Sequence, residues 1–149
     1  MAEITMKQQI CKYSIIRFLP YTETGEFANI GIVLYVPALQ LLAYKLLNPS
    51  QHERITHFFQ PLNQDLFGNI IPIILDELER IKKLLVQTTL KDVELYNELI
   101  RPREDIIRYS ENRVIVSASP EKTVAELFES YVHRTDTDSP QLPFPMEKP

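Results

Sequence analysis

The sequence predicts an α+β fold, in which an antiparallel N-terminal β-meander is covered by helices and followed by a small second hairpin and a C-terminal helix. Two patterns carry this prediction. Up to residue 48 apolar side chains alternate with a period of two, which is typical of strands, and beyond Ser50 they recur every three or four residues, which is typical of helices. A length of 149 residues fits one domain with a sizeable core.

Three strands are expected in the meander, and they cover residues 12–19, 26–36 and 40–47. Pro20 ends the first strand and Pro37 ends the second, because proline has no N–H for the sheet ladder. The second strand is apolar on both faces, which indicates a central strand covered on each side. Strict alternation along it places Asn29 on the same face as Gly31.

Helices are expected over residues 50–59, 69–87 and 92–100. In the long helix Pro72 falls in the first turn, where proline is tolerated. Glu79 precedes Lys83 by four residues, which indicates an ion pair on a solvated face.

The second hairpin is expected to join residues 106–109 to residues 113–117. Ser119 followed by Pro120 marks the start of the last helix. An apolar stripe along this helix comprises Val124, Leu127, Phe128 and Tyr131.

Residues 1–134 are therefore expected to form one α+β domain, and residues 135–149 a flexible tail. Four of the 11 prolines fall in this last stretch, which has few apolar side chains. Such a composition resists regular structure.

Composition and charge exclude several classes of function. The net charge of -4 has the wrong sign for general attraction to nucleic acid, and 3 glycines are too few for a phosphate-binding loop. No apolar run is long enough to span a membrane.

The single cysteine, Cys11, and the lack of a signal-like segment in the first ten residues favour the cytoplasm. Cys11 is expected to be a small buried apolar residue. His52 and His57 lie five residues apart with no partners for a zinc set, so no metal is expected. No cofactor is expected either.

Polar side chains gather at the first expected hairpin. Arg17 and Glu26 lie on paired strands and can come close together. Asn29 needs partners for its amide donors and its acceptor, and Gly31 costs stability unless something approaches the backbone closely. Two interpretations stay open: a structural cluster, or a ligand- or partner-binding site. The binding site would comprise Arg17, Glu26, Asn29 and Gly31, with the first three as weak catalytic candidates.

Basic residues cluster only before and within the second hairpin. They are Arg101, Arg103, Arg108 and Arg113, with Tyr109 between them. Three neighbouring acids nearly cancel this charge, so a solvated rim is favoured and nucleic-acid binding is the weaker alternative.

The segment YSIIRFLPYTETGEFANIGIVLYVP, residues 13–37, resembles the signature of an uncharacterised bacterial family, domain of unknown function 3037. A weaker likeness covers residues 101–132. The positions that match the signature are Arg17, Pro20, Gly25, Glu26, Asn29 and Gly31. The resemblance implies no catalytic chemistry, and it implies a protein partner, for which a HipA-like kinase is the candidate.

Two functions from different classes follow. The first is a non-catalytic binding or regulatory module that engages a protein partner, and the absence of any catalytic motif favours it. The alternative is an enzyme that acts on phosphate esters or nucleic acid through Arg17, Glu26 and Asn29.

Overall fold

A five-stranded antiparallel sheet forms the centre of the protein. The computed structural model describes residues 7–21, 23–48, 55, 58–59, 64–87, 93–101 and 106–133. The strands are β1 (Gln9–Phe18), β2 (Ala28–Val36), β3 (Leu41–Leu46), β4 (Ile107–Tyr109) and β5 (Arg113–Ser117). They lie in the order β3-β2-β1-β4, and β5 also pairs with β1. The helices are α2 (Gln64–Gln87), α3 (Val93–Leu99) and α4 (Pro120–Phe128), which continues into the π-helical segment η4 (Glu129–His133).

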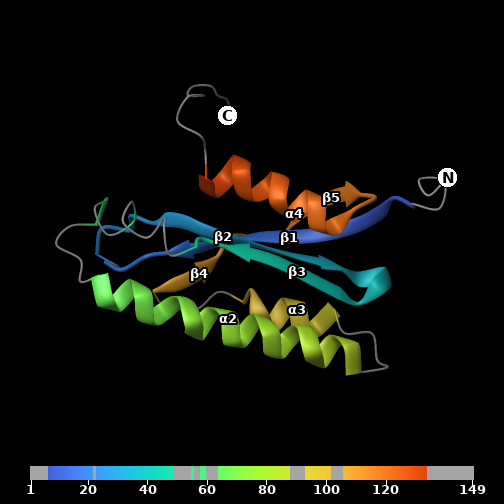
Figure 1. Cartoon of the computed structure of the whole chain (residues 1–149), viewed down its shortest axis with the longest axis horizontal. Coiled ribbons are helices and arrows are strands. Elements are labelled where there is room, and N and C mark those ends of the chain that lie inside the picture. The colour runs from blue at the N-terminus through green and yellow to red at the C-terminus, as the bar shows by residue number, and fades with distance from the viewer. Residues whose placement is uncertain are drawn as a thin grey trace.

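Helices cover both faces of this sheet, with α4 on one face and α2 and α3 on the other (Figure 1). Two adjacent residues of β3 show directly that successive side chains point to opposite faces of the sheet. The Lys45 ammonium lies 4.8 Å from the ring centroid of Phe128 in α4, whereas the Tyr44 hydroxyl donates to Glu79 of α2. The seven residues from Ile30 to Val36 in β2 are buried, as a central strand requires. The predicted α+β class and meander are confirmed.

Helix α2 differs from its prediction in two respects. It begins at Gln64 instead of Asn69, so Pro72 lies inside the helix and not in its first turn. The cause is packing: the Phe67 ring is buried 4.9 Å from the ring of Phe18, which extends the apolar face toward the N-terminus. Glu79 is also not on the solvated face, because it accepts the hydrogen bond from Tyr44 across the helix–sheet interface.

The two strands of the predicted second hairpin exist, but they pair with β1 instead of with each other. Tyr109 lies opposite Ile16 and Arg113 lies opposite Tyr13, so β4 and β5 continue one another along the same edge of β1. Between β4 and β5, the Ser110 hydroxyl accepts a hydrogen bond from the backbone N–H of Ile15 at 2.8 Å. A long edge strand with a bulge therefore replaces the expected separate hairpin.

Other boundaries agree with the sequence. Helix α3 lies within the expected residues 92–100, and α4 begins at Pro120 after Ser119. Gly25 has a positive φ of 72°. Of the expected helix over residues 50–59, only Ile55, Phe58 and Phe59 are described. Most of that prediction, and the predicted tail over 135–149, lie outside the described residues.

Tyrosines in the sheet and its helices predict an alkaline limit to stability. Burial, and next a hydrogen bond to Tyr131, raises the pKa of Tyr13 to about 12. Burial and a hydrogen bond to Glu79 raise the pKa of Tyr44 to about 12. Burial also raises the pKa of Tyr96. Since the folded state holds these protons more tightly, their contribution is present below pH of about 10 and is lost as the pH rises towards about 12.

We expect the tyrosinate absorbance that comes from these three residues to appear only above pH of about 10 in an alkaline titration. It should appear together with loss of the far-ultraviolet circular dichroism signal. All 7 tyrosines ionising near pH 10 in a protein that stays folded would contradict this result.

Candidate functional site

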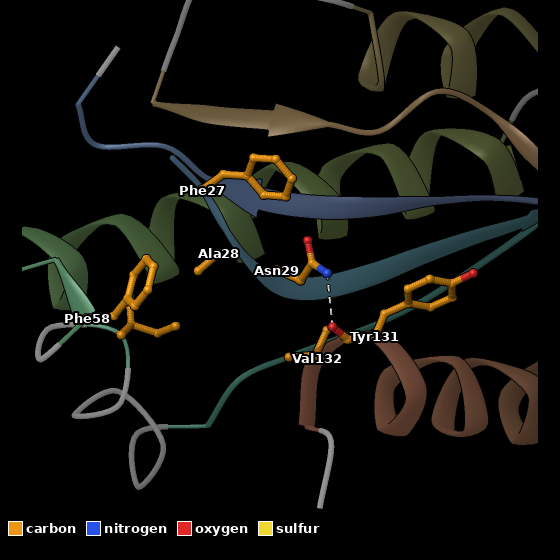
Figure 2. Close-up of a pocket in the computed structure, with 7 residues that line it drawn as sticks. Phe27, Ala28, Asn29, Phe58, Tyr131 and Val132 are labelled. Atoms are coloured by element: carbon orange, nitrogen blue, oxygen red, sulfur yellow. Dashed lines mark hydrogen bonds between the residues drawn. The ribbon is translucent and has the colours of Figure 1, made fainter. Parts of the chain in front are cut away.

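A pocket of about 350 Å³ lies where the start of β2 meets η4 (Figure 2). Its walls are Phe27, Ala28 and Asn29 at β2, Ile55 and Phe58 from the segment before α2, and Tyr131 and Val132 of η4. The side chains of these walls are mainly apolar, and polar atoms, the Asn29 amide among them, make up close to half of the lining surface. This volume is at the lower end of the range for small-ligand sites.

A β-bulge aims Asn29 into this region. Ile16 lies opposite Gly31 but Arg17 lies opposite Asn29, so Ile30 is an extra residue on β2. A bulge of this kind re-aims the neighbouring side chains. The Asn29 side chain therefore points to the α4 face, where it reaches η4. A Cβ at Gly31 would point to the opposite face, which α2 covers. The expectation that the two share a face is wrong, because strict alternation does not survive an inserted residue.

The Asn29 amide is held at one end and unpaired at the other. Its Nδ2 donates to the Tyr131 carbonyl oxygen at 3.0 Å, and that carbonyl lies near a helix end, where backbone acceptors lack partners within the helix. A carbonyl only accepts, so the amide nitrogen must face it and Oδ1 must face away. The buried Oδ1 has no hydrogen-bond partner within the described part of the chain, and Figure 2 shows it on the Phe27 side of the amide.

Arg17 lies beside the pocket, directly across the ladder from Asn29. Its guanidinium carbon is 4.4 Å from the ring centroid of Phe27, which is a cation–π contact with a wall of the pocket. The buried Nε has no acceptor among the described residues. Burial lowers the pKa of Arg17, nearby Glu111 raises it, and nearby Arg113 lowers it further.

Glu26 does not join these two residues. It is exposed, and its carboxylate and its backbone N–H contact the Thr24 hydroxyl, at 3.5 and 3.3 Å. Between the described residues, no hydrogen bond or ion pair joins Glu26 to Arg17 or to Asn29. The structure thus brings Arg17 and Asn29 together and leaves the only carboxylate of the predicted group in the loop.

Gly31 has a packing reason to be glycine. A Cβ built there would lie 2.5 Å from a methyl carbon of Leu46 and 2.8 Å from the backbone oxygen of Lys45. The close approach that the sequence suggested at Gly31 is therefore made by the neighbouring strand β3.

A hydrogen-bonded group fixes the position of η4. Arg113 donates to the Tyr131 hydroxyl at 3.1 Å and forms an ion pair with Glu111 at 3.2 Å, and the hydroxyls of Tyr13 and Tyr131 lie 3.5 Å apart. The sequence did not indicate that Tyr131, Val132, Phe27 and Phe58 share a pocket. Tyr131 was found only as part of an apolar stripe, and Phe58 carried no signal.

The remaining predicted features have ordinary structural roles. Arg101 pairs with Glu98 at the surface and Arg113 with Glu111, which supports a solvated rim instead of a nucleic-acid surface. Cys11 is fully buried, as predicted. Among the described residues, no group of side chains is suited to hold a metal ion, and none of the helices combines the length and hydropathy of a membrane-spanning segment. His52, His57 and Arg103 lie outside the described residues.

Fold and site together define an α+β domain with a pocket lined by mainly apolar side chains, an amide oxygen that lacks a partner among the described residues, and an adjacent guanidinium. A family model described as "Protein of unknown function (DUF3037)" matches residues 13–132. The chain belongs to this family, as the resemblance of its first hairpin predicted. Neither the curated proteins nor the solved structures give a match to the chain.

Proposed function

We propose that this protein is a non-catalytic binding module of the cytoplasm, and that its pocket between β2 and η4 receives an apolar part of a protein partner. The observation that carries this proposal is the pocket itself. Apolar walls with one unpaired hydrogen-bonding group are typical of recognition, since the walls contribute affinity and the polar group fixes orientation.

The arrangement around the pocket supports a module over an enzyme. General acid–base catalysis needs a titratable group within hydrogen-bond reach of the substrate. Glu26 was the carboxylate for that role, and it is exposed in the loop with Thr24 as its partner. Asn29 does not titrate, and Arg17 stays protonated at neutral pH. The residues that meet at the pocket can therefore bind a ligand, and no acid or base among them is placed to transform it.

Partner capture with a pocket variant tests this function. Phe58 lines the pocket and is 61% exposed, so Phe58→Ala should leave the fold intact while it removes an apolar wall. Ile73→Ala is the matched control, because Ile73 is 67% exposed on α2 and does not line the pocket. Loss of one anchoring side chain costs roughly 1 kcal/mol or more, which is about a fivefold loss of affinity.

We expect the tagged wild-type chain to retain a protein from its own cells whose recovery, measured by quantitative mass spectrometry, falls about fivefold with Phe58→Ala and is unchanged with Ile73→Ala. The HipA-like kinase that family context suggests is the first purified candidate. Equal recovery of every protein by the three chains would overturn the proposal. Turnover of a phosphate ester that is lost in Glu26→Gln would instead establish the enzyme.

A further inference from the structure

We propose that the pocket recognises the C-terminal residue of a polypeptide, with Arg17 pairing to its α-carboxylate, Asn29 accepting its backbone N–H, and the apolar walls receiving its side chain. This inference rests on the proposed function and names the chemistry of the bound group.

Arg17 indicates the anion. A half-buried guanidinium has lost part of its hydration, and that loss is normally offset by a carboxylate or phosphate. Within the described part of the chain, Arg17 has the Phe27 ring as its contact and no ion pair, and its buried Nε donates to nothing. Glu111, the acid whose charge raises the pKa of Arg17, is exposed and already paired with Arg113. An incoming oxyanion would supply the missing acceptor.

Asn29 indicates a donor on the same ligand. Its Oδ1 is a buried acceptor whose orientation is fixed by the bond from Nδ2 to Tyr131, so it requires an N–H or O–H from outside. Arg17 and Asn29 are cross-strand partners on one face, and such partners have their Cβ atoms roughly 4.5 to 5.5 Å apart. The Arg17 guanidinium lies against the Phe27 ring, and Oδ1 faces the same ring, so the donor and the anion of the ligand would lie close to each other.

A chain terminus fits all three requirements at once. On a single Cα it carries a carboxylate, an N–H donor and a side chain, which matches a guanidinium, an acceptor and apolar walls. An internal Asp or Glu places its carboxylate on the side chain that would have to fill the apolar space between Phe27, Phe58 and Val132. A phosphate carries about two negative charges, whereas Arg17 is the single guanidinium that lacks an acceptor here among the described residues.

The test uses the purified full chain and fluorescently labelled hexapeptide pools. One pool ends in Leu or Phe as the free acid, a second has the same sequences with a C-terminal amide, and a third is amidated and carries Glu at the fifth position. Anisotropy titrations measure each dissociation constant. We expect the acid pool to bind at least about tenfold more tightly than either amidated pool, since a charge-assisted hydrogen bond contributes about this much.

Arg17→Gln is expected to bring the acid pool to the level of the amide pool. Arg101→Gln is the matched control and should change nothing, because Arg101 pairs with Glu98 away from the pocket. If Arg17→Gln does not fold, the comparison of acid and amide on the wild-type chain still decides the question.

Equal binding of the acid and amide pools overturns the carboxylate assignment, and equal binding of the internal Glu pool overturns the terminal assignment. Absence of binding by every pool also overturns the inference. In each of these cases the proposed function survives where Phe58→Ala still weakens partner capture, so the two failures are distinguishable.

Discussion

Gly31→Ala is expected to lower the free energy of unfolding by about 1 to 3 kcal/mol, toward the upper end of the range for overpacked cores. The added methyl would stand 2.5 Å from Leu46 Cδ2 and 2.8 Å from the Lys45 carbonyl oxygen. The Leu46 side chain can rotate, but the carbonyl belongs to the backbone of β3 and moves only if the strand moves. Urea unfolding followed by circular dichroism measures the change.

Gly68→Ala provides the opposite control in the same chain. Gly68 lies in α2 with nothing within 4 Å of the position where a Cβ would stand. Alanine loses less conformational entropy than glycine in a helix, so this change should raise the free energy of unfolding by roughly 0.5 to 1 kcal/mol. Equal free energies of unfolding for Gly31→Ala and Gly68→Ala would show that Leu46 and β3 make room for the added methyl group, and would contradict the prediction for Gly31.

Asn29→Ala is expected to lower the free energy of unfolding by about 1 to 3 kcal/mol and also to reduce partner capture. The stability loss follows because the Tyr131 carbonyl, 102 residues away in the chain, loses the Nδ2 donor. The loss of capture follows because the unpaired Oδ1 at the pocket wall is removed with it.

Thermal unfolding and capture of the same partner, measured at a temperature where both chains are folded, separate the two effects. Val114→Thr is the control, since Val114 is exposed on β5 and does not line the pocket. A capture loss no greater than the unfolded fraction would assign Asn29 a purely structural role. An unchanged midpoint would contradict the contribution of its hydrogen bond to Tyr131.

The sequence by itself determined the class of the fold and most of its elements. Alternating apolar residues on both faces of β2 identified a buried central strand, and proline at position 37 stopped it, because these signals act within a few residues. The same local chemistry marked Pro120 for the start of α4. The resemblance of residues 13–37 also identified the family correctly.

Only the tertiary structure decided how these elements meet. The inserted residue Ile30 turned Asn29 to the α4 face, and the pairing of β4 and β5 with β1 replaced a hairpin that local turn chemistry favoured. The pocket joins β2 to η4 at the opposite end of the chain, and no periodicity links Asn29 to Tyr131. Register, bulges and pockets depend on pairing and packing between distant segments, whereas periodicity and turn chemistry are local, so the sequence showed which residues were candidates and the fold decided which of them meet.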